Sequence, residues 1–239
     1  MKQLILATLM LVLTGPAFAG REGNGAGGYE YLNANGEKEY QLLDLYEAKI
    51  PGLVHPNGLK IVETDEDYHA QALKAIYRLK QAGWHLMAEH VENMFKALVT
   101  SNKDVPFDPD RPGQRLELAF PEDAYNLFAA PKNYRPVGLA NWNDDLEVIY
   151  LDREKDKAMK SETSRAALRL HEAVYKALRV RDPKLEDSRM ARFIVGYLFS
   201  DMKPADYPFA NRLLALNADY ARYDMDSDTL DYVPDYIIP

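Results

Sequence analysis

The sequence predicts a single α+β domain that is mainly helical and carries a small antiparallel sheet. Long stretches on either side of the middle place apolar residues at helical spacing, which favours helices there. The middle of the chain instead has two short runs with strand-like patterns, and these predict the sheet. With 239 residues, of which 47% are hydrophobic and 28% charged, the chain can bury one core.

The N-terminus has the three parts of a secretory signal peptide. Lys2 supplies a positive charge, residues 4–13 form an apolar run, and Ala17-Phe18-Ala19 offers small residues at both positions that signal peptidase reads. The apolar run is too short for a transmembrane helix, which needs about 20 residues. We therefore expect cleavage after Ala19, no membrane span afterwards, and a periplasmic or secreted protein.

The chain is expected to fall into four parts. Five glycines between residues 20 and 28 indicate a loop, and no Gly-Lys-Ser/Thr ending marks it as a phosphate-binding loop. A short amphipathic helix is expected at 40–48. The parts are a signal peptide at 1–19, a glycine-rich segment with this short helix at 20–60, the main helical α+β domain at 61–223 and an acidic tail at 224–239.

An unbroken apolar stripe predicts helix from residue 65 to about residue 100. Thr64, with Asp67 three residues later, has the pattern of a capping box at its start. A straight helix of this length would span about 54 Å, whereas a domain of this size has a radius of gyration of about 17 Å. We therefore expect a kink at Gly83, or two helices that meet there.

Two strands are expected in the middle of the chain, at 115–120 and 146–151, with at most one further short strand between residues 121 and 142. The last third is expected to be helical. Ser161 or Thr163 can cap the first of its helices, and Asp187 or Ser188 can cap the second. The three helices are expected at about 161–180, 187–200 and 208–223.

Composition excludes several classes of function. The formal net charge of −8 argues against a nucleic-acid-binding surface, which would need a basic stripe. The absence of cysteine excludes disulfides, thiolate zinc sites and a cysteine nucleophile. Histidines and carboxylates are therefore the expected metal ligands, and zinc and calcium are the metals that the sequence suggests.

The pair His171-Glu172 resembles the first half of a His-Glu-x-x-His zinc site, in which the Glu activates water. Tyr175 stands where the second histidine would be, and His90 could join His171 on a shared zinc if the two helices pack together. The alternative is a buried core histidine beside a surface ion pair. In that alternative Glu172 would pair with one of three bases, Arg165, Arg169 and Lys176.

The acidic tail matches part of an EF-hand calcium loop. The pattern departs from that loop at Thr229, which stands in place of the usual glycine, and at Pro234, which precedes the chain end without an exiting helix. The alternative is a solvated acidic tail. The calcium ligands would be Asp224, Asp226, Asp228 and Asp235.

Several segments together resemble a group of exported proteins, mostly from Gram-negative bacteria, to which no biochemical activity is assigned. In that group too, a tyrosine follows the His-Glu pair at the position of the second histidine. The resemblance implies export and a shared fold, and it implies no substrate. The resembling segments are 23–25, 42–47, 146–152, 170–175 and 188–200.

The preferred prediction is an exported, soluble cell-envelope or secreted protein with a non-catalytic binding or structural role. The alternative is a zinc-dependent hydrolase that uses His171 and Glu172, with Glu172 as the base that activates water. A partner would be another protein or an envelope component, and the sequence does not specify which.

Overall fold

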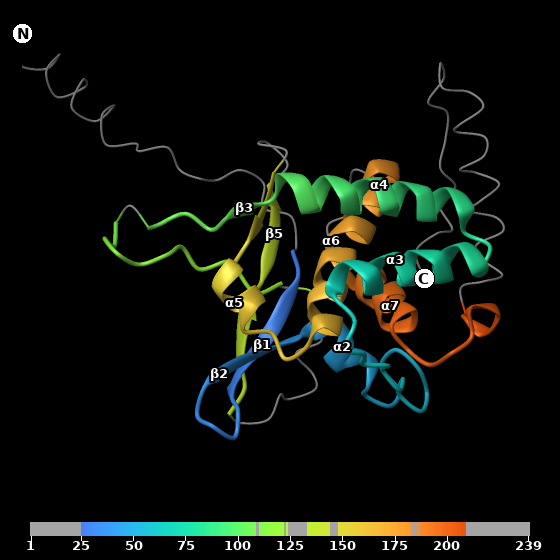
Figure 1. Cartoon of the computed structure of the whole chain (residues 1–239), viewed down its shortest axis with the longest axis horizontal. Helices are drawn as coiled ribbons and strands as arrows, with labels where there is room; N and C mark the ends of the chain where they lie inside the picture. Colours follow the sequence, from blue (N-terminus) through green and yellow to red (C-terminus); the bar gives the residue numbers. More distant parts are fainter. Residues whose placement is uncertain are drawn as a thin grey trace, which may run out of the picture.

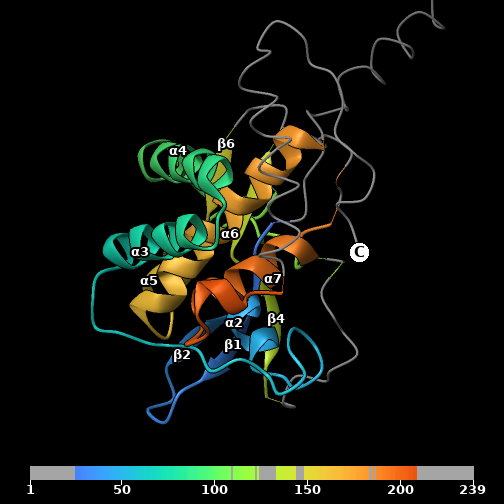
Figure 2. The ribbon, with the colours of Figure 1, turned by 90° about the vertical axis from the view of Figure 1, so that its right-hand side faces the viewer.

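Helix α6 (Glu162–Arg181) lies at the centre of the molecule, between the other long helices and the strands (Figures 1 and 2). The computed structural model describes residues 25–108, 110–121, 123, 133–143, 148–182, 185 and 187–208. In this part of the chain, six α-helices and two three-stranded sheets form one domain. The predicted fold class, α+β and mainly helical, is therefore confirmed.

The sequence of α6 explains its central place. Ser161 caps the helix as predicted, because its side chain accepts a hydrogen bond from the Ser164 N–H at 3.2 Å. The small side chains on α6 let α3 (Tyr68–Gln81), α4 (His85–Ser101) and α7 (Arg189–Leu198) pack directly against it. The smallest of its fully buried residues are Ala166, Ala167, Ala173 and Ala177.

Helices α3 and α4 meet near Gly83, which is one of the two arrangements that the sequence predicted. Gly83 has a φ of 98°, in the left-handed region that favours glycine, so the first helix ends there. The start of α3 differs from the prediction. Asp67 is the N-cap and accepts hydrogen bonds from the next turn, whereas the Thr64 N–H bonds to the Thr163 hydroxyl at 3.3 Å.

The strands form two sheets of different kinds. The first is antiparallel with β1 in the centre, in the order β2-β1-β4. The second has the order β3-β6-β5, with β3 parallel and β5 antiparallel to the central strand. The strands are β1 (Gly27–Leu32), β2 (Lys38–Leu42), β3 (Lys103–Asp104), β4 (Arg135–Gly138), β5 (Ala140–Asn143) and β6 (Val148–Leu151).

The strand at β6 was predicted, but other strand predictions were wrong. Residues 115–120 form no strand, although the Leu118 and Ala119 carbonyls pack closely against Gly138 of β4. Two strands rather than one, β4 and β5, follow before residue 144. The helix expected at 40–48 is shorter than predicted: only α2 (Leu43–Ala48) is helical. The residues before it belong to β2, because they pair with β1.

The remaining elements are short. Helix α5 (Arg153–Lys157) precedes α6, and the 3₁₀ helix η1 (Pro204–Asp206) follows α7. Among the described residues, no helix combines the length and the apolar composition that a membrane crossing requires. The predicted signal peptide at 1–19, nearly all of the predicted helix at 208–223 and the tail at 224–239 lie outside the described residues.

Candidate functional site

Charged side chains from α2, α6 and α7 meet in the interior, where these three helices pack together. Each helix carries its apolar face to the common core, and the charged residues are set within those faces. We call them the buried ionic cluster, and each is at most 3% exposed. Its members on the helices are Asp44 and Glu47 of α2, His171 and Glu172 of α6, and Arg192 of α7.

His171 is fully buried and is held by α2. Its Nδ1 lies 2.8 Å from Oδ2 of Asp44, which is also fully buried. Burial alone would lower the pKa of His171, but the Asp44 carboxylate outweighs burial and raises it. Nε2 of His171 and Oδ1 of Asp44 are buried and have no hydrogen-bond partner among the described residues.

Glu172 holds the chain where it enters β1. Its Oε1 accepts the backbone N–H of Ala26 at 2.7 Å, while its Oε2 is buried without a partner in the described part of the chain. Burial raises the pKa of Glu172, against the opposing effects of His171 and the Ala26 N–H. The chain is confined here, because a Cβ on Gly25 would lie 2.1 Å from the Ala140 carbonyl oxygen.

The predicted surface ion pair of Glu172 is therefore wrong. The α6 bases expected to pair with it face other groups, because Glu172 lies on the buried side of the helix. Arg169 forms a two-pronged ion pair with Asp156, at 2.7 and 2.9 Å, and Arg165 pairs with Asp156 and Glu162. The third base, Lys176, lies over the Trp142 ring.

Arg192 joins α7 to two other parts of the chain. Its Nε donates to Oε2 of Glu47 at 2.9 Å, and its Nη1 donates to Oδ1 of Asp123 at 2.8 Å. Nη1 also bonds to Ser188 Oγ, and Nη2 bonds to the Asp123 carbonyl oxygen. The Asp123 carboxylate in turn accepts from the N–H and hydroxyl of Ser188, the N-cap of α7. A guanidinium, with five donors in a plane, suits such a junction.

The cluster holds more acidic groups than basic ones. Four carboxyl groups lie beside one guanidinium and one imidazole. Buried charge is unfavourable unless it is paired, and the raised pKa values of His171 and Glu172 both act to retain protons and so reduce the negative excess. The arrangement fastens backbone segments that are far apart in sequence.

The structure places the other predicted metal ligands as follows. Tyr175 is 1% exposed, and its ring centre lies 6.2 Å from that of His171. His90 is half-buried on α4. Among the described residues, no three His, Asp or Glu side chains are grouped as a metal would require. The predicted calcium ligands Asp224, Asp226, Asp228 and Asp235 lie outside the described residues.

Sequence reasoning missed the other charged members of the buried ionic cluster. Asp44 and Glu47 lie one helical turn apart within the otherwise apolar Leu42–Ala48 run, and Arg192 lies in a helix that is apolar almost all round. Charged residues inside apolar runs are the signal that could have found them, because such groups need a buried partner. The segments 42–47, 170–175 and 188–200, which carry part of the resemblance, supply these cluster residues.

No protein-family model matches the chain, and no curated protein or solved structure matches it either. The resemblance to exported bacterial proteins therefore stays a prediction.

Replacing Arg192 should strongly destabilise the fold. Arg192→Met leaves the Glu47 and Asp123 carboxylates buried without their cation, so we expect the free energy of unfolding to fall by about 3–5 kcal/mol in urea titrations. Arg189→Met is the matched control on the same helix, because Arg189 pairs with Asp187 at the surface; it should change stability by less than about 0.5 kcal/mol. Equal effects of the two substitutions would contradict the role given to Arg192.

Acid should loosen the Asp123 junction. Burial alone would raise the pKa of Asp123, but Arg192 and Ser188 outweigh burial and lower it. Such a carboxyl stabilises the fold above its unfolded pKa of about 3.9, and the stabilisation is lost as the pH falls through the folded pKa. We expect the melting temperature to decline below about pH 4, with a shallower decline in Asp123→Asn, as measured by thermal unfolding across pH. An identical decline in both proteins would contradict this.

Proposed function

We propose that the chain is an exported cell-envelope or secreted protein with a non-catalytic binding or structural role. Export is supported by the charged start, apolar run and small-residue cleavage pattern of the N-terminus. The observation that carries the non-catalytic role is the burial of His171 and Glu172, which are 0% and 2% exposed. A catalytic acid or base has to lie within hydrogen-bond reach of its substrate, and these two side chains are covered by protein.

Each of the two side chains also has a structural partner. His171 binds Asp44 and so holds α2 against α6, whereas Glu172 binds the Ala26 N–H and so holds the start of β1. These contacts join residues that are 127 and 146 positions apart in the chain. The cluster therefore supports the frame of the molecule, and binding is left to its outer surface.

The test measures how much each of these two side chains contributes to stability. His171→Ala should lower the free energy of unfolding by about 1–3 kcal/mol, because it removes a buried hydrogen bond and leaves a cavity. Glu172→Ala should cost about as much, since it orphans the Ala26 N–H, whereas Glu172→Gln keeps an acceptor oxygen and should cost less. Urea unfolding of the protein from residue 20 onward measures all three.

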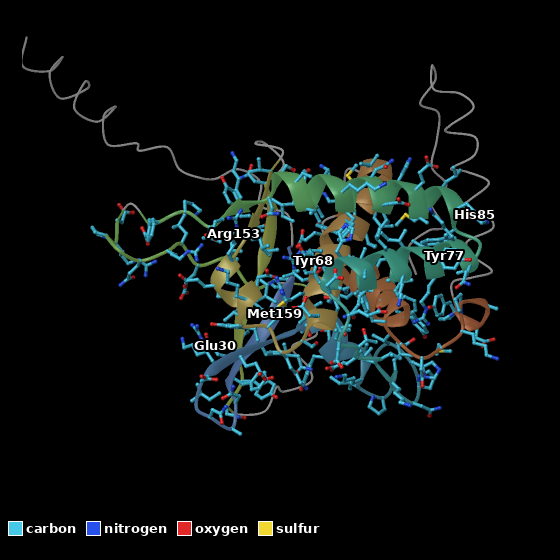
Figure 3. The ribbon with its side chains drawn as sticks, in the orientation of Figure 1. Glu30, Tyr68, Tyr77, His85, Arg153 and Met159 are labelled. Atoms are coloured by element: carbon cyan, nitrogen blue, oxygen red, sulfur yellow. The ribbon has the colours of Figure 1, made fainter. Side chains whose placement is uncertain are left out.

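His85 provides the control. It lies at the exposed start of α4 (Figure 3), so His85→Ala should leave stability within about 0.5 kcal/mol of the parent. If His171→Ala and Glu172→Ala left stability unchanged, the structural role of the cluster would be wrong. Fractionation of cells expressing the full chain tests export, and retention of uncleaved protein in the cytoplasm would contradict it.

A zinc-dependent hydrolase is the second candidate, and the geometry of His171 favours it. A carboxylate on Nδ1 is the arrangement that commonly orients a metal-binding histidine, with Nε2 turned to the metal. Asp44 provides that carboxylate, and Nε2 has no partner among the described residues. Glu172, with its raised pKa, would be the group that activates water.

Elemental analysis of the purified protein distinguishes the two candidates. The hydrolase requires about one equivalent of zinc, which His171→Ala should remove, whereas the structural role expects less than about a tenth of an equivalent.

A thermal-shift titration with Ca²⁺ tests the calcium site proposed at Asp224, Asp226, Asp228 and Asp235. A rise in melting temperature that Asp226→Asn abolishes would support that site, and no rise would overturn it.

A further inference from the structure

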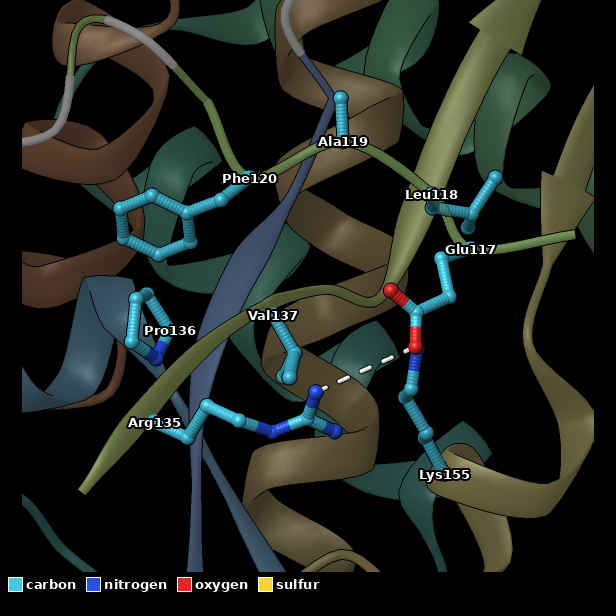
Figure 4. Close-up of a pocket in the computed structure, with 8 residues that line it drawn as sticks. All are labelled: Glu117, Leu118, Ala119, Phe120, Arg135, Pro136, Val137 and Lys155. Atoms are coloured by element: carbon cyan, nitrogen blue, oxygen red, sulfur yellow. Dashed lines mark ion pairs between the residues drawn. The ribbon is translucent and has the colours of Figure 1, made fainter. Parts of the chain in front are cut away.

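A cavity of about 310 Å³ lies beside β4, between that strand and residues 117–120. Figure 4 shows Phe120 and Pro136 on one side of it and Glu117 and Lys155 on the other, with Arg135 between. The cavity is distinct from the buried ionic cluster, and none of the residues that line it belongs to that cluster. Its volume is at the lower end of the range for small-molecule sites, which favours a small ligand.

The polar side of the cavity offers groups that make no hydrogen bond to the described residues, namely Nη1 of Arg135 and the Glu117 carboxylate. Arg135 donates from Nε and Nη2 to Glu30, at 3.3 and 2.9 Å. Its Nη1 faces Glu117, but the distance to Oε1 is 3.9 Å, which is too long for a hydrogen bond. One ligand group that donates and accepts hydrogen bonds can therefore accept from Nη1 and donate to the Glu117 carboxylate.

Lys155 adds a further donor. Its Nζ donates to the Gly138 carbonyl oxygen at 3.1 Å and lies 2.9 Å from Oδ2 of Asp152. An ammonium group has three N–H donors, so these two contacts leave one N–H for a ligand. The side chain is only 13% exposed and is fixed at the wall of the cavity by both contacts.

The charges around the cavity have a negative excess, with three carboxylates beside two cations, which argues against a simple anion site. Arg135 is already paired with Glu30, and Lys155 with Asp152, while Glu117 adds a negative charge at the rim. A phosphate or carboxylate would gain little net attraction and would meet the Glu117 carboxylate. Hydroxyl groups suit this lining better, because each can accept from a cation and donate to a carboxylate.

The opposite side of the cavity is apolar. It is formed by Phe120 and Pro136, with Val137 at the base. The Phe120 ring packs against the buried Tyr29, at a ring-centre distance of 6.0 Å, so this apolar surface is in place before any ligand binds. A ligand that fits both sides needs a ring with hydroxyl groups at its edge and C–H groups on its face.

We propose that this cavity binds a pyranose sugar, with its hydroxyls between Glu117, Arg135 and Lys155 and its C–H face toward Phe120 and Pro136. The proposal rests on the binding role proposed above and gives it a ligand class. The polar groups fix the orientation of the ring, and the apolar wall excludes water from one face of it. An envelope or extracellular glycan would present such a ring.

The test is an NMR titration of the ¹⁵N-labelled protein, from residue 20 onward, with glucose and with N-acetylglucosamine. We expect saturable shifts of the backbone amides of residues 117–120 and 137–138, with a dissociation constant on the order of 1 mM. Glu117→Gln removes the acceptor charge and should weaken binding about tenfold, the effect of one charge-assisted hydrogen bond.

Glu154→Gln is the matched control. Glu154 and Glu117 are both largely exposed glutamates that pair with an arginine: 79% of the Glu154 side chain is accessible, and 73% of that of Glu117. Unlike Glu117, Glu154 does not line the cavity. Its substitution should leave the dissociation constant within about twofold. Equal weakening by both substitutions, no saturable shift up to about 100 mM sugar, or binding of acetate instead of sugar would each overturn the sugar site.

These results are separable from the proposed function. Suppose that no sugar binds, that the purified protein holds no zinc, and that His171→Ala and Glu172→Ala both lower stability. The sugar site is then wrong, and the non-catalytic role stands. If the purified protein carries zinc that His171 holds, the non-catalytic role fails whatever the titration shows.

Discussion

The ion pair between Arg192 and Glu47 is the contact on which the other parts of the buried ionic cluster depend. It lies where α7 crosses α2, with both side chains nearly inaccessible. A buried guanidinium without partners would be strongly unfavourable, so this crossing tolerates few alternative packings. Asp123 completes the coordination of the guanidinium and brings a third part of the chain to the same point.

The cluster also determines how the first sheet is attached. Glu172 binds the chain at Ala26, one residue before β1, and β1 is the central strand between β2 and β4. The glycines at this entry permit contacts that side chains would prevent: a Cβ on Gly28 would lie 2.6 Å from both the Gln41 carbonyl and a Leu139 methyl. The proposed sugar cavity, beside β4, therefore rests on a sheet that the interior of the protein holds in place.

The sequence could predict features that local interactions determine. The N-cap of α6, the break at Gly83 and the strand at β6 follow from residues that are neighbours in the chain. The strand β1 could not be predicted in this way, because its glycine-rich start pairs with β4, which is distant in sequence. The cluster could be predicted in part. A buried core histidine at position 171 was one of the two alternatives that the sequence offered, but the buried position of Glu172 depends on the Ala26 N–H, which is distant in sequence.

The Nε2 of His171, which has no hydrogen-bond partner among the described residues, separates the two candidate functions in physical terms. A histidine that is only structural normally satisfies both ring nitrogens, because an orphaned buried polar atom is unfavourable. Protonation, which Asp44 favours, makes Nε2 a donor and increases its need for an acceptor. In the structural role, the stabilisation from the Asp44 contact must therefore exceed the cost of leaving Nε2 without a hydrogen bond. In the hydrolase, the ring must be neutral so that Nε2 can bind a metal. The burial of His171 favours the structural role, and its protonation state is a second criterion that separates the two.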